Sequence, residues 1–176
     1  MMRTEKTIVE INVHPGKFSW GRSGTRMRTV LGSCIAMCAW HPILGIGGMA
    51  HIMLPSRPRT IVGEKDPRYA DEAAELFFET FRNFGTNPSD YQVKIFGGSS
   101  LLPGPEDNHA PGFQTGARIG RKNIEATLDI IKKHKLNMLA NDVGGMKYRK
   151  IIFDLDNGDI WLKRMSVQTL EEDQPT

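Results

Sequence analysis

Two short apolar segments, TVLGSCIAMCA at residues 29–39 and IGGMAHIML at residues 46–54, decide the fold predicted for this chain. Both segments have compositions compatible with β-strands. The HPIL stretch between them, at residues 41–44, carries the proline expected of a loop. The pattern therefore predicts an antiparallel hairpin with a four-residue loop.

The register of this hairpin predicts a thiol beside an imidazole. Counting outward from a pair formed by Trp40 and Gly45, Cys34 comes to lie opposite His51. Directly opposed side chains share a face of the sheet, with Cβ atoms about 4.5–5.5 Å apart. The small residues Gly47 and Ala36 would leave a depression beside the pair. A loop one residue longer or shorter would give Cys34 another partner.

The remaining segments complete a pattern of strands and two helices. Strands are predicted at residues 7–13, 92–96, 136–141, 149–155 and 159–166, with a DNG hairpin turn at residues 156–158. Helices are predicted at residues 70–84, ended by Gly85, and at residues 123–135. Residues 55–68 and 102–120 are predicted as an exposed connection and a long loop. The fold class is therefore α+β, with a β-sandwich-like mixed sheet core flanked by two main helices.

Length and composition predict a single cytoplasmic domain over residues 1–176, with a core at about 7–166 and a frayed acidic tail at 167–176. The net charge of +3 is too small to indicate nucleic-acid binding. The first residues lack the apolar stretch of a secretion signal, and no apolar stretch is long enough for membrane insertion. Two cysteines exclude a disulfide-stapled scaffold. A monomer is the default expectation.

The Cys34–His51 pair has the composition of a nucleophilic site. A thiolate attacks carbonyl carbon, and a neighbouring imidazolium lowers the thiol pKa. Gly32 and Ser33 could supply backbone N–H groups for an oxyanion. The competing interpretation is that free cysteines are small buried hydrophobic residues, which we adopt for Cys38.

A zinc site is the alternative, with ligands from Cys34, Cys38, His41 and His51. On one strand, however, the two cysteines would be about 13 Å apart, too far for one ion or for a disulfide. We therefore expect no metal, and a thiol with an imidazole needs no organic cofactor.

Other polar and glycine-rich positions are weaker candidates. His14 and His109 are predicted in a turn and a loop, and His134 at a helix C-terminus, where its charge suits the helix dipole. The GGSS stretch at residues 97–100 could cradle an anion, but it lacks a P-loop lysine and is better explained as a tight turn near the active surface. Four cations could meet an acidic partner or simply be solvated: Arg57, Arg59, Lys65 and Arg68.

Ordered motifs along nearly the whole chain resemble the CheD family of chemoreceptor glutamine deamidases. They are LGSC at residues 31–34, GGMAHIMLP at 47–55, YAD at 69–71, IFGGSS at 95–100, IGRKNIE at 119–125 and DVGG at 142–145. The resemblance implies hydrolysis of the γ-carboxamide of receptor glutamines to glutamate and ammonia. It also implies a fold similar to that of bacterial toxin glutamine deamidases. The implied partners are the cytoplasmic helical region of chemoreceptors and a CheC-type phosphatase, and a non-catalytic module that binds these partners is the alternative function.

The resemblance further implies that Cys34 is the nucleophile and His51 the general base and acid. The third catalytic residue of the family is a threonine shortly before the cysteine, for which Thr29 is the nearest match. On one regular strand, an offset of five residues would point Thr29 away from Cys34. A bulge at Gly32 could restore the direction. If the family spacing is six residues, Arg28 occupies this place instead.

Overall fold

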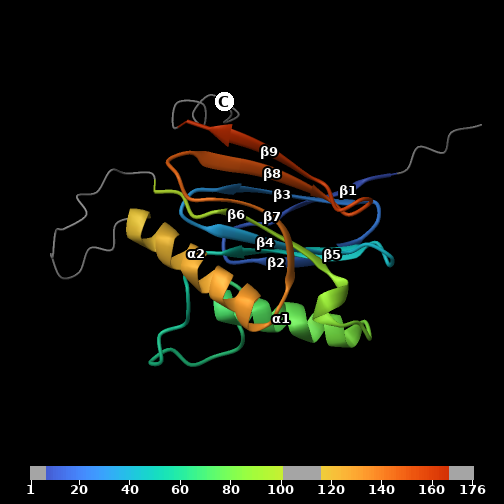
Figure 1. Cartoon of the computed structure of the whole chain (residues 1–176), viewed down its shortest axis with the longest axis horizontal. Coiled ribbons are helices and arrows are strands. Elements are labelled where there is room, and N and C mark those ends of the chain that lie inside the picture. Colours follow the sequence, from blue (N-terminus) through green and yellow to red (C-terminus); the bar gives the residue numbers. More distant parts are fainter. Residues whose placement is uncertain (1–6, 101–115, 167–176) are drawn as a thin grey trace, which may run out of the picture.

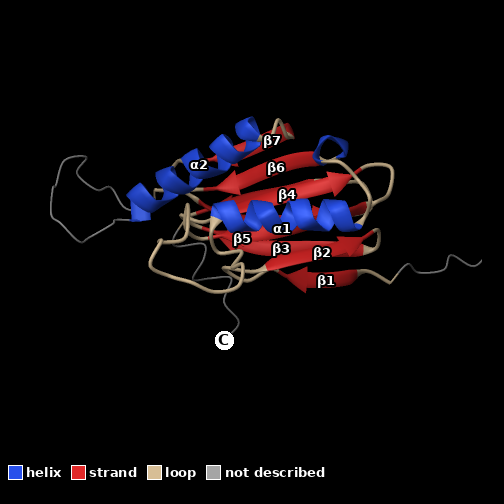
Figure 2. Cartoon of the chain, turned by 90° about the horizontal axis from the view of Figure 1, so that it is seen from below, coloured by secondary structure: helices blue, strands red, loops and turns tan. Residues whose placement is uncertain are grey.

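The computed structural model describes residues 7–100 and 116–166, which form three layers (Figure 1). Four strands, in the order β1-β3-β8-β9, make an outer sheet, and five strands, in the order β2-β5-β4-β6-β7, make a middle sheet. Both long helices cover the free face of the middle sheet (Figure 2). The elements are β1 (Val9–Asn12), β2 (Phe18–Arg22), β3 (Thr25–Leu31), β4 (Ile35–His41), β5 (Ile46–Ile52), α1 (Ala70–Asn83), the 3₁₀ turn η1 (Pro88–Asp90), β6 (Gln92–Gly97), α2 (Gly116–Lys133), β7 (Asn137–Val143), β8 (Tyr148–Asp154) and β9 (Ile160–Met165).

Burial on both faces explains the apolar runs of the central strands. Every residue of β5 and all but one of β4 are buried. One hydrophobic cluster lies between the two sheets, and a second lies between the middle sheet and the helices. A strand covered on both faces has no polar face, so its sequence is a continuous apolar run instead of an alternating one. The predicted α+β class, a sandwich-like core with two main helices, is confirmed.

The first helix forms and ends as its sequence predicts. Its buried positions recur at helical spacing and include Phe77 and Phe81. The Phe81 ring stacks on Tyr91 with ring centroids 3.8 Å apart. At the C-terminus, Gly85 has φ of 65° and its N–H donates to the Arg82 carbonyl, while the Thr86 N–H donates to the Phe81 carbonyl. This paired arrangement requires a left-handed residue, which glycine adopts without steric cost.

The segment at residues 29–39, predicted as one strand, is two strands in different sheets. Thr29 belongs to β3 of the outer sheet, and β4 of the middle sheet begins at Ile35. The chain crosses between the sheets at residues 32–34. The crossing is held by the Ser99 N–H, which donates to the Gly32 carbonyl, and by the Gly98 N–H, which donates to the Cys34 carbonyl. Because both strands face the buried interlayer, their apolar composition does not reveal the break.

Two further differences from the sequence prediction concern a helix boundary and an additional strand. Helix α2 begins at Gly116, not at residue 123, because the glycines of this stretch are typical of loops and hide the start of the helix in the sequence. Strand β2, with the sequence FSWGR, was missed because its hydrophobic pattern is short and mixed. The other strands and the turn at residues 156–158 are confirmed, with ends shifted by a few residues. The rest of the predicted loop, which contains His109, and the predicted tail at 167–176 lie outside the described residues.

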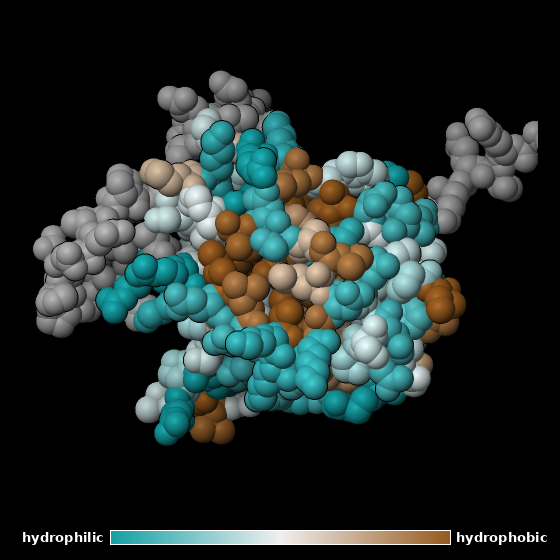
Figure 3. Space-filling model, in the orientation of Figure 1, coloured by the Kyte–Doolittle hydropathy of each residue, from teal (hydrophilic) through white to brown (hydrophobic). Residues whose placement is uncertain are grey.

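The edge of the sandwich that faces the viewer in Figure 3 is partly apolar. Hydrophobic side chains gather in the middle of this face and are surrounded by hydrophilic ones. Leu139 of β7 and Trp161 of β9, both on strands at the sheet edges, are about half exposed. The helices therefore leave this edge uncovered. Among the described residues, no helix has the length and apolar character needed to span a membrane.

A buried guanidinium joins the two sheets near the crossing. Arg149 of β8 is 4% exposed and donates to the Asp142 carboxylate at 2.6 Å, to the Ser99 hydroxyl at 2.5 Å and to the Gly144 carbonyl at 2.7 Å. Burial by itself would raise the pKa of Asp142, but hydrogen bonds from Arg164 and Arg149 outweigh it and hold the pKa below its ordinary value. Because the guanidinium fork satisfies groups from the turn after β6 and from the end of β7, it stabilises the arrangement of these two segments relative to β8.

Replacing this buried cation should destabilise the fold far more than replacing its exposed neighbour. Arg149→Met leaves the hydroxyl, the carbonyl and part of the carboxylate without their donor, so we expect a loss of about 3–5 kcal/mol in the free energy of unfolding. Arg164→Met, at a position 58% exposed, should lose less than about 1 kcal/mol. Urea unfolding of both variants measures the difference, and equal losses would contradict the role assigned to Arg149.

Candidate functional site

Thr29 and His51 meet in the buried layer between the two sheets. Thr29 comes from β3 of the outer sheet, and His51 comes from β5 of the middle sheet. The Thr29 hydroxyl lies 2.8 Å from His51 Nδ1 and donates to the Val13 carbonyl at 2.7 Å. Thr29 is 8% exposed and His51 is 1% exposed. The hydrogen bonds therefore fix the plane of the imidazole within the core.

The direction of these hydrogen bonds determines which ring nitrogen of His51 carries the proton. A carbonyl can only accept, so the Thr29 hydroxyl gives its single proton to the Val13 carbonyl. The Thr29 oxygen must then accept a hydrogen bond from His51 Nδ1, which also lies 3.4 Å from the Val13 carbonyl, a group that can only accept. The neutral ring consequently holds its proton on Nδ1. Its Nε2 lone pair is the one available to accept a proton.

Thr29, and not Arg28, occupies the position next to His51. Alternate residues of β3 are buried, and Thr29 belongs to the buried set that faces the middle sheet. Arg28 belongs to the other face and forms an ion pair with Glu10. The offset of five residues between Thr29 and Cys34 does not turn their side chains apart, because the two residues do not share one strand. Thr29 belongs to the outer sheet and Cys34 directly precedes β4 of the middle sheet, and both face the layer between the sheets. A bulge at Gly32 is not needed.

The predicted register between Cys34 and His51 was wrong by two residues, although the predicted face was right. His51 pairs with Ala36, and the pair Ile35–Ile52 ends the ladder. Extending this register places Cys34 opposite Met53 and diagonal to His51. Diagonal neighbours on one face have Cβ atoms within about 7–8 Å, a gap that an imidazole ring can reach across. Cys34 packs against the interlayer cluster, so both side chains face the outer sheet.

The depression predicted at Gly47 and Ala36 is filled. A Cβ atom on Gly47 would lie 3.1 Å from a methyl group of Leu155 and 2.5 Å from the Ala39 carbonyl. Ala36 is fully buried. The outer sheet, which the hairpin prediction did not include, occupies the space. Access to the site must therefore come from the end of the hairpin and not from its face.

Burial governs the protonation of both candidate groups. Burial raises the pKa of the Cys34 thiol. Burial also lowers the pKa of His51, by more than its hydrogen bond to the Val13 carbonyl raises it. Both shifts favour the uncharged forms. The resting pair is thus best described as a neutral thiol and a neutral imidazole, and the ionised thiol expected from the sequence is not supported.

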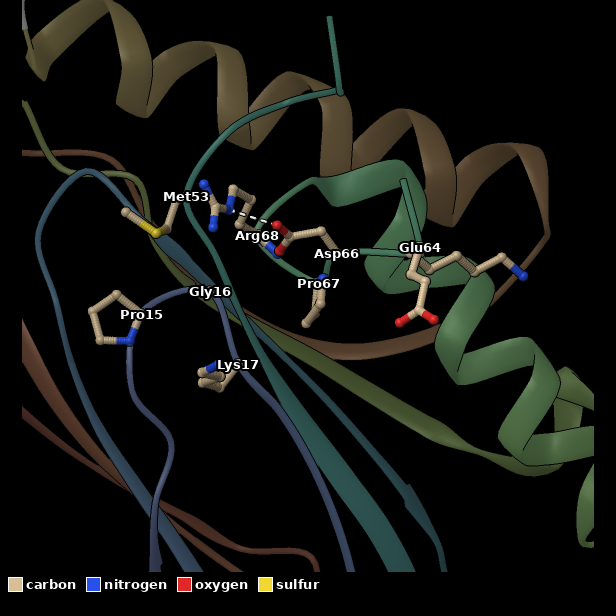
Figure 4. A pocket seen from close by; sticks show the side chains of 9 residues that line it. Pro15, Gly16, Lys17, Met53, Glu64, Asp66, Pro67 and Arg68 are labelled. Atoms are coloured by element: carbon tan, nitrogen blue, oxygen red, sulfur yellow. Dashed lines mark hydrogen bonds and ion pairs between the residues drawn. The ribbon is translucent and has the colours of Figure 1, made fainter. Parts of the chain in front are cut away.

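A cavity of about 470 Å³ opens just beyond the end of β5 (Figure 4). Its walls come from the turn at residues 15–17, from Met53 and from residues 64–68. The turn adjoins the site directly, because the Gly16 N–H donates to the His51 carbonyl and the His51 N–H donates to the Lys17 carbonyl. Charged groups of both signs line the cavity, and Arg68 forms an ion pair with Asp66. The cavity is therefore polar and adjoins the backbone of His51, although neither His51 nor Cys34 is among the residues that line it.

The alternative zinc ligands do not form a cluster. His41 lies at the opposite end of β4 from Cys34, with its ring packed edge-on against Tyr91. Cys38 is fully buried in the interlayer cluster, and burial raises the pKa of its thiol. Within residues 7–100 and 116–166, no group of three or more candidate ligands could hold a metal ion. Cys38 is thus a core residue, as expected.

The remaining candidates have structural partners. In the GGSS stretch, the N–H groups of Gly98, Ser99 and Ser100 all donate to backbone carbonyls, so the stretch is a tight turn and not an anion cradle. His134 packs against Phe78 at the helix end.

The predicted cationic surface is largely neutralised. Arg57 pairs with Glu72, and Lys65 pairs with Glu75 and Glu79. A helix surface with acidic residues would therefore find less free positive charge here than the sequence indicated.

Two groups near the site were not predicted. The Val13 carbonyl orients the hydroxyl of Thr29, but a backbone group leaves no trace in the sequence. Asn123 of α2 donates from Nδ2 to the Ser33 carbonyl at 3.0 Å and to the Met53 carbonyl at 2.9 Å. This residue lies within one of the quoted motifs, yet its spacing from Cys34 and His51 gives no indication that the three meet.

Comparison with known proteins identifies the family. The family model described as CheD chemotactic sensory transduction matches residues 53–164. The chain is 40% identical to a probable chemoreceptor glutamine deamidase CheD of Pseudomonas savastanoi pv. phaseolicola, covering 98% of this chain and 94% of the relative. It is 42% identical to the protein of the same name from Pseudomonas fluorescens, with the same coverage. It is 37% identical to a probable chemoreceptor glutamine deamidase CheD 1 of Leptospira interrogans, covering 93% of this chain and 98% of the relative. The chain belongs to the CheD family.

Proposed function

We propose that this protein hydrolyses the side-chain amide of glutamine residues in chemoreceptors, with Cys34 as nucleophile, His51 as general base and acid, and Thr29 as the residue that orients His51. The names of the relatives support the reaction and the substrate. The observation that carries the residue assignment is the hydrogen bond between Thr29 and His51 Nδ1, which leaves Nε2 basic on the face that Cys34 shares.

The proposed reaction proceeds in two halves that balance without a cofactor. The Cys34 sulfur attacks the amide carbon while His51 Nε2 takes the thiol proton. His51 then gives this proton to the amide nitrogen, and ammonia leaves a thioester behind. Water attacks the thioester, and His51 takes the water proton and returns it to the sulfur. Glutamate is released, and the thiol and imidazole are restored to their neutral forms.

The proposed approach of the substrate is through the cavity at residues 15–17, Met53 and 64–68. Its volume of about 470 Å³ lies within the range of small-molecule pockets, which is enough room for a glutamine side chain. Its mixed charges match a polar helix surface better than an apolar or strongly acidic one. Substrate choice by surface shape also fits a reaction in which the reacting group is only an amide.

Removing the proposed nucleophile should abolish the reaction. Cys34→Ala should lower amide hydrolysis by about 10³-fold or more, because no other group of the site can form the thioester. Cys38→Ala, which removes the buried thiol of the same strand, should remain active. Mass spectrometry of a receptor fragment measures the gain of about one dalton for each converted glutamine. If Cys34→Ala retains activity, the alternative of a non-catalytic binding module gains support.

The pH dependence should reflect a neutral resting pair. Since the pKa of His51 lies below its ordinary value of 6.5, the neutral base persists as the pH falls and activity should decline only below about pH 6.5. Since the pKa of Cys34 is raised, its alkylation by iodoacetamide should become about tenfold faster per pH unit through neutral pH. A rate of alkylation that is constant between about pH 6 and 8 would instead indicate a resting thiolate–imidazolium pair.

The hydroxyl group of Thr29 should matter more for the rate of the reaction than the shape of the side chain. Thr29→Val keeps the volume of the side chain but removes the acceptor for His51 Nδ1, so we expect kcat to fall by about 10–100-fold. Thr29→Ser keeps the hydroxyl and should recover most of the rate. Steady-state kinetics on a receptor fragment compares the two variants. Equal activity of the valine and serine variants would exclude the orienting role.

A further inference from the structure

Asn123 is a fully buried polar residue that touches both chain segments of the proposed active site. It lies on α2, and its side-chain amide donates one hydrogen bond to the Ser33 carbonyl at 3.0 Å and one to the Met53 carbonyl at 2.9 Å. Ser33 directly precedes Cys34, and Met53 follows His51 by two residues. A single NH₂ group thus joins the segment of the thiol to the segment of the imidazole.

The bridge lies where the strand ladder stops. Backbone pairing between β4 and β5 ends at Ile35 and Ile52. Beyond this pair, backbone hydrogen bonds hold each segment to other neighbours: Gly98 donates to the Cys34 carbonyl, and the Met53 N–H donates to the Arg68 carbonyl. The β4–β5 ladder itself no longer joins the two segments. Asn123 places its amide across this gap. The side chain therefore adds a link between the two segments next to Cys34, just before β4 begins.

Close packing of glycines brings α2 within reach of the bridge. A Cβ atom on Gly120 would lie 2.7 Å from the Gly98 carbonyl, and one on Gly98 would lie 2.4 Å from Ile124. Larger residues at these positions would push the helix away from the sheet. Gly120 precedes Asn123 by three residues, so both lie on one face of α2. In Figure 1, α2 begins at the end of the sandwich where β4 starts and β5 ends.

We propose that Asn123 is a positioning residue for the deamidation reaction, fixing the separation of Cys34 and His51 through the carbonyls of Ser33 and Met53. This inference rests on the proposed function. Asn123 does not touch the reacting atoms. It acts through the backbone, by keeping the thiol within proton-transfer distance of the ring. Small errors in such a distance lower the rate of a reaction strongly while leaving substrate binding nearly unchanged.

The chemistry of the bridge requires an amide and not merely a side chain of similar size. Two carbonyl oxygens need two donors, which the NH₂ group provides and a carboxylate does not. Asn123→Asp has almost the same volume but replaces the NH₂ donor that faces the two carbonyls with a negatively charged oxygen that can only accept. Asn123→Ser is a milder change, since a hydroxyl has one proton and a shorter reach. Both variants keep the residue polar and should differ in how much of the bridge they remove.

Thr127 supplies a matched control on the same helix. It is also fully buried, and its hydroxyl donates only to the Asn123 carbonyl one turn before it, at 2.8 Å. Thr127→Val therefore removes a buried hydrogen bond from α2 without altering either carbonyl of the bridge. Comparing Thr127→Val with the Asn123 variants therefore distinguishes a general loss of stability in α2 from a specific effect on the active site.

Kinetics on a receptor fragment tests the proposal. Asn123→Asp should lower kcat at least about tenfold with KM changed less than about twofold, Asn123→Ser should lower kcat less, and Thr127→Val should change neither. Urea unfolding shows whether each variant is folded at the assay temperature. If the aspartate variant does not fold, the serine variant decides. A folded Asn123 variant with unchanged kcat, or a kcat loss of the same size in Thr127→Val, would overturn the proposal.

A measurement on the unaltered protein separates this inference from the proposed function. NMR should show both side-chain amide protons of Asn123 exchanging slowly with solvent, with scalar couplings to the carbonyl carbons of Ser33 and Met53. If the bridge is seen but Cys34→Ala remains fully active, the proposed mechanism fails and the positioning role falls with it. If Cys34→Ala is inactive but the amide protons exchange rapidly, the mechanism stands and the bridge is refuted.

Discussion

The crossing of the chain from the outer sheet to the middle sheet is the constraint on which the site depends. Thr29 is an inward-facing residue near the end of β3, and three residues after Leu31, the last residue of this strand, Cys34 faces the same layer from the other side. A single continuous strand could not bring both side chains to one place. The tight turn after β6, which donates two backbone hydrogen bonds to this crossing, holds it in position.

Placing reactive groups between two sheets has an energetic cost that sets their chemistry. Burial opposes the charged forms of both Cys34 and His51, as the directions of their pKa shifts show. An ion pair in this layer would have to overcome desolvation of both partners. A neutral thiol with a neutral base avoids this cost until a substrate amide arrives. The Thr29 hydroxyl and the Val13 carbonyl provide hydrogen-bond partners for Nδ1 of the ring. Burial of the imidazole therefore does not leave this N–H group without an acceptor.

Much of the fold followed from local sequence patterns, whereas the site followed only in part. The spacing of Phe77 and Phe81 and the glycine at position 85 define α1, because helix amphipathicity and its termination are local properties. The crossing at residues 32–34 was not predicted, because strands buried on both faces give no alternation that would mark their ends. Asn123 could not be linked to Cys34 either. The hydrogen bond from Asn123 to the Ser33 carbonyl depends on how α2 docks, and this docking includes a close approach between Gly120 and Gly98, which are far apart in the sequence.

The error in the hairpin register changed which residues pair between β4 and β5, but not the face on which Cys34 and His51 lie. Because successive side chains of a strand point to opposite faces, an error of two residues keeps Cys34 and His51 on one face. Both faces of β4 and β5 are buried, so the apolar composition of these strands does not exclude a shift of one residue, and the turn decides the register. Gly45 has φ of 59° and its N–H donates to the His41 carbonyl, so it belongs to the loop and cannot pair with Trp40 as a strand residue. The imidazole and the thiol therefore lie on a common face as diagonal neighbours, and His51 contacts Thr29 across the layer through Nδ1.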